Sequence, residues 1–294
     1  MSATDQATLG DRDQVSLSVV MPVYNEEPTV LRAIGEVLQT DFGHPIELIV
    51  VDDGSTDGTS LLLNQLDDPR AIVYRHPANL GKGAAVLTGA GLATGSHLVV
   101  FDADCEYRAA DLARMLEPIA RGHVDVVYGT RLLGMNTVFQ SYWHALGNRM
   151  TTLATNIMFN ANITDLHTCL KMLPLPLFRQ LHLTQCGFGL DTEISAELLR
   201  RGHRPFEVPV SYMSRSHAQG KKLTWRDGFN CLAVLGRVRL RARVRNSPSW
   251  RANAHQFRIG ENRPVASNSG GHCGLSADSV APPSRTHEVL PSVR

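Results

Sequence analysis

The chain contains the stretch Val99-Val100-Phe101-Asp102-Ala103-Asp104-Cys105-Glu106. An apolar run typical of a buried strand ends there in two carboxylates one residue apart, and a third acidic residue follows. Alternate residues of an extended segment point to the same side, so Asp102 and Asp104 can converge on one hard cation. Oxygen ligands of this kind suit Mg²⁺ or Mn²⁺, and Mg²⁺ is usually held together with substrate phosphates. The alternative is a simple turn, because turns also favour Asp.

Strands and helices alternate around this stretch. Apolar runs predict strands at 17–23, 46–51, 71–74, 97–101 and 124–128. Helices are predicted after most of them, at 29–39, 59–66, 82–93 and 110–120. This alternation predicts an α/β fold with a mostly parallel, Rossmann-like central sheet flanked by helices. In such sheets ligands bind beyond the carboxyl ends of the strands.

Each unusual polar cluster follows a predicted strand. The clusters are 22–27, 52–57, 102–106 and 129–131. Because the carboxyl ends of parallel strands meet at one edge of a sheet, we expect these clusters to lie together there. The sequence therefore predicts one site at this edge.

The first two clusters have two interpretations each. Tyr24, Asn25 and Glu26 offer an aromatic face and polar edges for a nucleotide base or ribose, or they form a helix-capping loop. Asp52-Asp53-Gly54-Ser55 is either an Asx-turn or a carboxylate that recognises a base or ribose.

Lys82 stands in Gly81-Lys82-Gly83, where a predicted helix begins. The spacing of a P-loop is absent, so that motif is excluded. A lysine at a helix N-terminus can still approach an anion.

Composition limits the class of protein. Hydrophobic residues make up 43% and charged residues 19% of the chain, and the formal net charge is +1, so we expect a soluble globular protein that does not bind nucleic acid. The five cysteines lack metal-binding spacing, which favours a cytoplasmic protein. No apolar run approaches the roughly 18 residues of a membrane span, so membrane contact is expected to be peripheral.

Four regions are predicted. Residues 1–14 form a disordered leader, 15–226 the principal domain, 227–245 a basic element and 246–294 a disordered tail. Six arginines and one aspartate give residues 226–245 a net charge of +5. Arginines alternate with apolar residues over 237–245, and this period of two fits a strand better than a helix. The basic element either anchors the protein to a membrane surface, which we favour, or is merely solvated.

The motifs together resemble family 2 glycosyltransferases with the GT-A fold. The matching stretches are Ser18 to Glu27, Val51 to Thr59, Asn79 to Gly83, and Asp102-Ala103-Asp104. Further stretches resemble the dolichyl-phosphate or polyprenyl-phosphate mannose and glucose synthases: 129–131, 165–171, 188–194, 207–212, and Arg215 with 220–228. Those enzymes move a hexose from GDP-mannose or UDP-glucose to a lipid phosphate at the cytosolic membrane face.

The resemblance implies roles for individual residues. The residues that would hold the nucleoside are Pro22, Tyr24, Glu26, Val51 and Asp53. Asp102 and Ala103 would contact the donor, and Asp102, Asp104 and Glu106 would surround the metal. Glu106 stands where the mannose synthases often carry Gln. The residues that would face phosphates are Arg131, Arg215, and Lys221 or Lys222.

A lipid phosphate is already ionised near neutral pH, so it needs cations rather than a protein base. Arg131, Arg215 and the lysine pair supply them, unless they are surface charges. Asp165 and Asp191 are candidates for binding sugar hydroxyls, or for general-base catalysis if the acceptor is a hydroxyl compound. The leading hypothesis is a metal-dependent polyprenyl-phosphate hexosyltransferase, and inversion at the anomeric carbon is what the resemblance implies. The alternatives are a family 2 enzyme acting on a soluble or glycan hydroxyl, and a non-catalytic scaffold.

Overall fold

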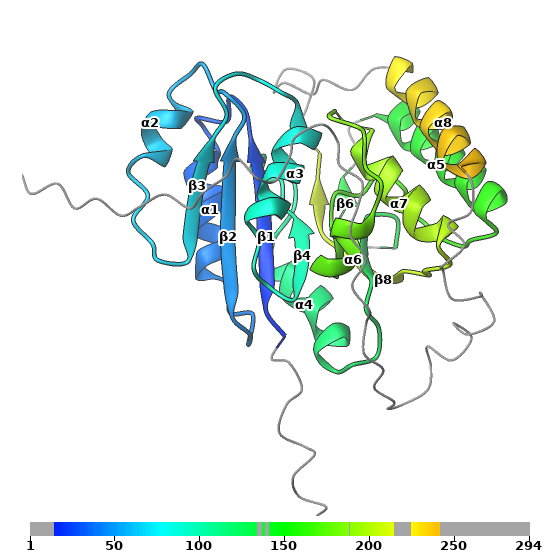
Figure 1. Ribbon diagram of the computed structural model, residues 1–294, viewed down its shortest axis with the longest axis horizontal. Helices are drawn as coiled ribbons and strands as arrows, with labels where there is room; N and C mark the ends of the chain where they lie inside the picture. The colour runs from blue at the N-terminus through cyan, green and yellow to red at the C-terminus, as the bar shows by residue number, and fades with distance from the viewer. Residues whose placement is uncertain (1–14, 134–136, 139–140, 188, 215–224, 242–294) are drawn as a thin grey trace, which may run out of the picture.

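The computed structural model describes residues 15–133, 137–138, 141–187, 189–214 and 225–241 (Figure 1). The predicted leader at 1–14 and the predicted tail at 246–294 lie outside these ranges. In the described part, no helix has both the length and the apolar character needed to cross a membrane.

The central sheet has seven strands in the order β3-β2-β1-β4-β7-β5-β8. β7 runs antiparallel to both of its neighbours, and all the other pairs are parallel, which confirms the predicted mostly parallel sheet. The strands are β1 (Leu17–Val23), β2 (Ile46–Asp52), β3 (Ala71–Arg75), β4 (His97–Val100), β5 (Val127–Thr130), β7 (Lys171–Pro174) and β8 (Phe206–Pro209).

β5 begins later than predicted, because the residues that pair with β8 are Val127 to Thr130 rather than 124–128. A separate two-stranded sheet pairs β6 (Thr137–Val138) with β9 (Tyr212–Met213). The helices are α1 (Val30–Gln39), α2 (Thr59–Leu63), α3 (Lys82–Leu92), α4 (Ala109–Ala120), α5 (Tyr142–Phe159), α6 (Leu175–Gln180), α7 (Leu190–Arg200) and α8 (Trp225–Leu240).

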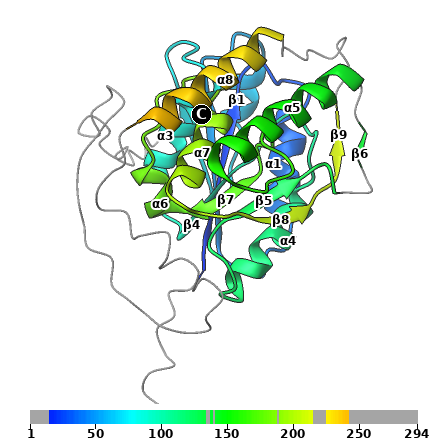
Figure 2. The same ribbon diagram turned by 90° about the vertical axis from the view of Figure 1, so that its right-hand side faces the viewer.

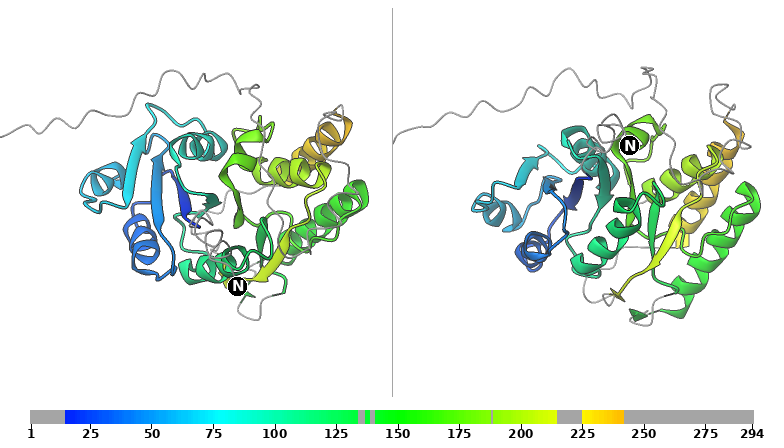
Figure 3. Two further views of the ribbon diagram at one scale, coloured as in Figure 1. Left: turned by 60° about the horizontal axis from the view of Figure 1, so that its bottom comes forward. Right: turned by 90° about the horizontal axis from the view of Figure 1, so that it is seen from below.

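Helices cover both faces of the sheet, as the two views in Figure 3 show. Alternate residues of β1 enter different cores: Val19 and Met21 pack with α1 and α4, whereas Val20 packs with α3, α6 and α7. This follows from the period of two along a strand, because both faces of a parallel sheet are buried. The run of apolar residues in β1 is thus explained by burial on two sides.

A third apolar cluster joins α5, α7 and α8, which lie together in Figure 2. Val234, Leu235 and Val238 of α8 are fully buried in it. Their spacing is helical, and the chain remains helical through Leu240. The strand predicted over 237–245 is therefore wrong for its described part, because burial of this apolar stripe outweighs the period of two in the arginines.

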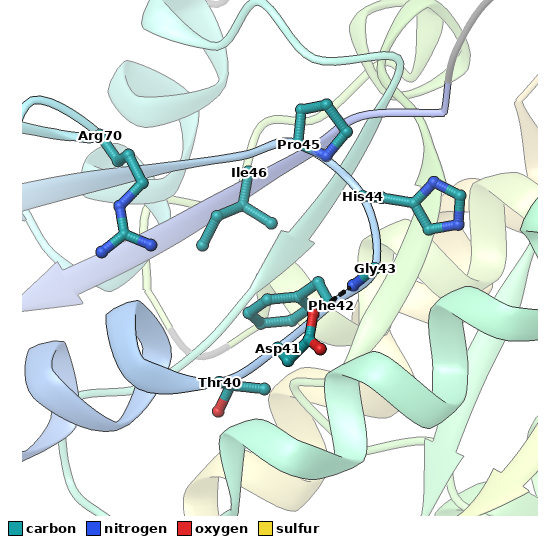
Figure 4. Close-up of a pocket in the computed structure, with 8 residues that line it drawn as sticks. All are labelled: Thr40, Asp41, Phe42, Gly43, His44, Pro45, Ile46 and Arg70. Atoms are coloured by element: carbon teal, nitrogen blue, oxygen red, sulfur yellow. Dashed lines mark hydrogen bonds between the residues drawn. The ribbon is translucent and has the colours of Figure 1, made fainter.

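A surface pocket lies at the edge of the sheet where β1 and β2 begin (Figure 4). Its lining residues are Thr40, Asp41, Phe42, Gly43, His44, Pro45, Ile46 and Arg70. This is the opposite edge from the predicted site, and none of the predicted site residues lines the pocket.

Candidate active site at the carboxyl ends of the strands

The loops that follow β1 and β2 are hydrogen-bonded to each other at the carboxyl edge of the sheet. Asn25 donates its backbone N–H to Ser55 Oγ at 3.0 Å, and its side-chain oxygen accepts from the Thr56 N–H at 2.8 Å. The Glu26 N–H donates to Thr59 Oγ1 at 3.0 Å. These bonds fix the backbone around Asn25, whose φ is 55°. The predicted nucleoside residues Asn25 and Glu26 therefore lie on a fixed loop.

The other predicted nucleoside residues lie beside this loop. Pro22 and Tyr24 are half-buried, at the end of β1 and just after it. Val51 is fully buried in the core between β2 and α3. Its side chain is therefore part of the packing, and only its backbone faces the strand end.

Asp52 and Asp53 both point inward. Asp52 accepts from the Ser55 N–H at 2.8 Å and from Ser60 Oγ at 2.6 Å. Asp52 therefore stabilises a local turn, which was one of the two interpretations of this stretch. Asp53 accepts from the Leu80 and Gly81 N–H groups at 3.0 and 2.8 Å. It also lies 2.7 Å from His76 Nδ1. Asp53 thus holds the loop that leads into α3.

The N-terminus of α3 is closed by the segment before α7. The Cys186 carbonyl accepts from the Gly83 and Ala84 N–H groups at 2.7 and 3.3 Å. A Cβ at Gly81, where φ is 96°, would lie 2.4 Å from that same carbonyl. Glycine is required here by close backbone approach. The Gly83 and Ala84 amides, which could otherwise bind an anion at this helix end, are therefore occupied.

Lys82 instead extends toward the acidic stretch after β4. Its Nζ lies 2.7 Å from Asp102 Oδ2 and 3.9 Å from Asp191 Oδ2. Burial alone would lower the pKa of Lys82, but the two carboxylates outweigh it and raise the pKa above its ordinary value. Lys82 is therefore a permanent cation at the site.

Asp102 and Asp104 follow β4 as predicted, with Ala103 buried between them. Asp102 Oδ1 is buried and has no hydrogen-bond partner within the described ranges. Asp104 Oδ1 accepts from the Glu106 N–H at 3.0 Å. A buried carboxylate oxygen without a donor fits a cation ligand, because buried polar atoms are otherwise nearly always satisfied.

Glu106, which is predicted to surround the metal, contacts a tyrosine through one of its carboxylate oxygens. Its Oε2 accepts from the Tyr212 hydroxyl at 2.7 Å. In the part of the chain that the structure describes, no three His, Cys, Asp or Glu side chains come together as a metal site. Two carboxylates completed by substrate phosphates remain sufficient for Mg²⁺.

Arg131, which follows β5, makes a bidentate ion pair with Asp165. Its Nε lies 2.6 Å from Asp165 Oδ2 and its Nη2 lies 2.7 Å from Asp165 Oδ1. Asn148 of α5 donates to the same Oδ1 at 2.8 Å. Burial would raise the pKa of Asp165, but Arg131 and Asn148 outweigh it and lower the pKa to about 2. Asp165 is therefore an anion that orients Arg131.

Arg131 also lies over an aromatic ring. Its Cζ is 5.0 Å from the centroid of the Tyr212 ring, and that ring contacts Tyr107 at a centroid distance of 5.1 Å. Burial raises the pKa of Tyr212, so its hydroxyl stays protonated and donates to Glu106. A continuous chain of contacts thus joins Asp165, Arg131, Tyr212 and Glu106.

Two further ionisable residues of the site were missed by the sequence interpretation. Lys171, in β7, is 2% exposed, lies 3.8 Å from Asp191 Oδ1 and donates to the Asp191 carbonyl at 2.7 Å. His167 lies 2.8 Å from Thr151 Oγ1, and burial lowers its pKa to about 4. The signal available for Lys171 was a lysine between apolar residues of a strand, since buried lysines need partners.

Three predicted phosphate contacts lie outside the described ranges: Arg215, Lys221 and Lys222. The structure brings together Asp102, Asp104, Lys82 and Asp191 on one side, and Arg131 with Asp165 on the other.

Comparison with known proteins identifies the family. The model of Glycosyl transferase family 2 matches residues 18–181, which is more than half of the chain. The chain belongs to glycosyl transferase family 2. The resemblance drawn from the motifs is thereby confirmed.

Curated relatives of this family 2 chain come from archaea and bacteria. Glycosyltransferase AglJ of Haloferax volcanii is 29% identical over 68% of this chain and 64% of its own length. Polyprenol monophosphomannose synthase of Mycolicibacterium smegmatis is 27% identical over 67% of this chain and 77% of its own. The low-salt glycan biosynthesis hexosyltransferase Agl6 of Haloferax volcanii is 26% identical over 68% of this chain, but the chain spans only 48% of that relative.

Solved structures share the fold. Glucosyl-3-phosphoglycerate synthase from Mycobacterium tuberculosis, in complex with phosphoglyceric acid, superimposes with a TM-score of 0.59 at 17% identity, over 77% of this chain and 80% of that one. The same enzyme with Mg²⁺ and uridine diphosphate gives a TM-score of 0.57 at 18% identity, over 77% and 79%. The expected GT-A-type fold is confirmed.

Proposed function

We propose that this family 2 protein transfers a hexose, mannose or glucose, from a nucleotide diphosphate sugar to a polyprenyl phosphate of the dolichyl type, with inversion at the anomeric carbon. The observation that carries the proposal is the pair Asp102 and Asp104 at the carboxyl edge of the sheet, with Asp102 Oδ1 buried and without a donor among the described residues. The relative named polyprenol monophosphomannose synthase supports the acceptor.

The nucleoside of the donor would bind at the two joined loops after β1 and β2. Tyr24 and Glu26 would contact it from the first loop, while Pro22 and Val51 would do so through the backbone at the strand ends. Asp53 would act indirectly, because it holds the loop 79–81 in place. A related fold has been solved with uridine diphosphate, so GDP-mannose and UDP-glucose are the donors to compare.

The cofactor would be Mg²⁺ or Mn²⁺, ions present in solved structures of the same fold. Asp102 and Asp104 would hold it, with Glu106 beside them. A divalent ion supplies Lewis-acid stabilisation of the charge that develops on the departing diphosphate. Lys82 places a second, permanent positive charge beside Asp102.

The charges of the site favour an acceptor that is already ionised. Asp165 has a pKa of about 2 and its oxygens accept hydrogen bonds from Arg131 and Asn148, so it is unsuited to take a proton. An ionised phosphate needs no base: its oxygen forms a bond to the anomeric carbon, the bond from that carbon to the diphosphate oxygen breaks, and the nucleoside diphosphate leaves with the electron pair. Arg131, Arg215 and Lys221 or Lys222 would orient the acceptor phosphate.

A hydroxyl acceptor is the second candidate, and one observation favours it. Asp191 is 15% exposed and lies between Lys82 and Lys171, where a carboxylate could serve as general base. Under that alternative the acceptor would be a soluble compound or a glycan.

A transfer assay tests the proposal. Labelled GDP-mannose and UDP-glucose are each offered with Mg²⁺ or Mn²⁺, with and without a short polyprenyl phosphate. We expect label to enter the organic phase with one donor and only when the lipid is present. Donor binding without lipid-dependent transfer would favour the hydroxyl acceptor, and absence of donor binding would favour a scaffold. The proposed place of action is the cytosolic face of a membrane, with the protein bound peripherally.

A further inference from the structure

α5 has its polar face inside and its apolar face outside. The residues buried on its inner side include Asn148, Thr151, Thr152 and Thr155. At the spacing of three and four residues typical of one helix face, the opposite side carries an outer stripe: Trp143, Leu146, Met150, Leu153 and Ile157. Trp143 is 75% exposed and Ile157 is 73% exposed, while Leu146 is half-buried. A helix of a globular protein normally shows the reverse arrangement.

The inner face is polar because it supports the active-site segment. Besides the bond from Asn148 to Asp165, Thr152 Oγ1 accepts from the Leu166 N–H at 3.1 Å. Asn156 exchanges two hydrogen bonds with the backbone of Ile163, at 2.8 and 3.0 Å. These polar side chains on the inner face therefore have hydrogen-bond partners. The exposure of the apolar outer stripe still needs an explanation.

Charge around the outer stripe is positive. α5 has no acidic residue, and its Arg149 is exposed. α8 packs against α5 (Figure 2), and its Arg237 and Arg239 are exposed. Arg239 Nε donates to the Met158 carbonyl at 2.9 Å, so this charge lies directly beside the end of α5. The surface thus combines apolar side chains with basic ones.

We infer that the outer stripe of α5, flanked by Arg149, Arg237 and Arg239, is the surface by which this protein docks on an anionic lipid bilayer. An amphipathic helix that carries large apolar side chains and basic residues lies in the plane of such an interface. Tyr142 and Trp143, in edge-to-face contact at the start of α5, are residue types enriched at the level of lipid headgroups.

A second copy of the chain is the other occupant to consider. A two-fold interface over the same stripe would bring the basic residues of both copies toward one another, because the same patch serves both partners. Like charges placed face to face oppose association. The anionic bilayer satisfies both the apolar stripe and the charges around it.

The choice of a lipid surface also rests on the proposed lipid-linked acceptor. α5 contacts Asp165 on its inner side, and Asp165 orients Arg131. A bilayer against the outer stripe would therefore lie one helix away from the residue proposed to orient the acceptor phosphate. This arrangement would keep a membrane-embedded acceptor close to the candidate site.

Vesicle co-sedimentation of the full chain tests the inference, with phosphatidylcholine vesicles containing roughly 30% phosphatidylglycerol and no polyprenyl phosphate. The stripe variant is Trp143→Gln/Leu153→Gln/Ile157→Gln. The matched control, Leu31→Gln/Leu61→Gln/Ile72→Gln, removes three exposed apolar side chains from α1, α2 and β3, at the other end of the sheet in Figure 1. We expect the stripe variant to partition at least about tenfold less than wild type, and the control to remain within about twofold.

A second variant tests the contribution of the basic residues to vesicle binding. Arg149→Gln/Arg237→Gln should reduce partitioning onto the anionic vesicles by about fivefold or more, and should change little on pure phosphatidylcholine. Wild-type partitioning by the stripe variant would overturn the inference. So would a dimer in sedimentation velocity that the stripe variant converts to a monomer while vesicle binding is unchanged, since the stripe would then be an interface between copies.

Membrane docking and hexose transfer can be tested independently of each other. The stripe variant should still transfer hexose to a short polyprenyl phosphate dispersed in detergent, because none of its changed residues contacts the candidate site. If the wild type transfers no hexose in that assay but still binds vesicles, the proposed function is refuted and the docking surface is not. Retained transfer with unchanged vesicle binding by the stripe variant would refute only the docking surface.

Discussion

Lys82 Nζ lies 2.7 Å from Asp102 Oδ2, so the aspartate that follows β4 receives its cation from the helix that precedes this strand in the chain. The other oxygen of Asp102 is buried and has no partner among the described residues. One carboxylate thus faces a permanent cation on one side and is open to a metal ion on the other.

Replacing Lys82 by Met should change metal binding in the absence of donor. The lysine competes for Asp102, so its removal should tighten binding of Mn²⁺ by about tenfold, although loss of this half-buried pair should destabilise the fold by about 1–3 kcal/mol. Isothermal titration and thermal unfolding measure the two effects. Unchanged Mn²⁺ affinity in a folded Lys82→Met variant would contradict the role given to Asp102.

Asp104→Asn should abolish transfer while the protein stays folded. Because the change keeps the shape of the side chain and removes its charge, turnover should fall at least about 100-fold and metal-dependent donor binding should weaken. The matched control is Asp67→Asn, at an exposed aspartate before β3. Normal turnover by Asp104→Asn would rule out the metal role.

The pair Arg131 and Asp165 predicts a dependence of stability on pH. The pKa of Asp165 in the folded protein is about 2, below its ordinary value of 3.8, so its contribution is complete above that value and is lost as the pH falls from about 4 toward about 2. The contribution is on the order of 2 kcal/mol. Urea unfolding of wild type and Asp165→Asn measures it.

The difference in unfolding free energy between these two proteins should be largest near neutral pH and should shrink by about pH 3. A difference that does not depend on pH over this range would mean that the ion pair with Arg131 is not what stabilises Asp165. Asp41→Asn, at the opposite edge of the sheet, serves as the control.

Tyr212 should act as a positioning residue for Arg131. Its hydroxyl donates to Glu106 and its ring lies under the guanidinium, so Tyr212→Phe should loosen the contact between the acidic stretch and Arg131. We expect a lower kcat with little change in the KM for the donor. A double-mutant cycle with Glu106→Gln should give a coupling of about 1 kcal/mol, and strictly additive effects would exclude the link.

The parts of the site that the sequence predicted are those governed by local patterns. The strand that precedes Asp102 and the turn at Asp52 follow from apolar runs and turn chemistry. The contact of Tyr212 with Arg131 joins residues far apart in the chain, from the end of β5 to the separate β6–β9 sheet, and no periodicity indicates it.

The helical state of 237–240 and the outward apolar face of α5 were missed for the same reason. Tertiary packing decides which face of a segment is buried. Val234, Leu235 and Val238 are buried only because α5 and α7 cover them, and Asn148 turns inward only because Asp165 lies there. The helix pattern alone would have placed the apolar stripe of α5 inside.

The most direct test of the central claim compares two acceptors that differ only in the phosphate. Labelled donor and divalent metal are supplied with a short polyprenyl phosphate or with the matching free polyprenol. The account predicts that label enters the lipid product only with the phosphate, because the cations proposed to orient the acceptor match a phosphate and Asp165 is unsuited to act as a base. Equal or preferential transfer to the free alcohol would contradict the account.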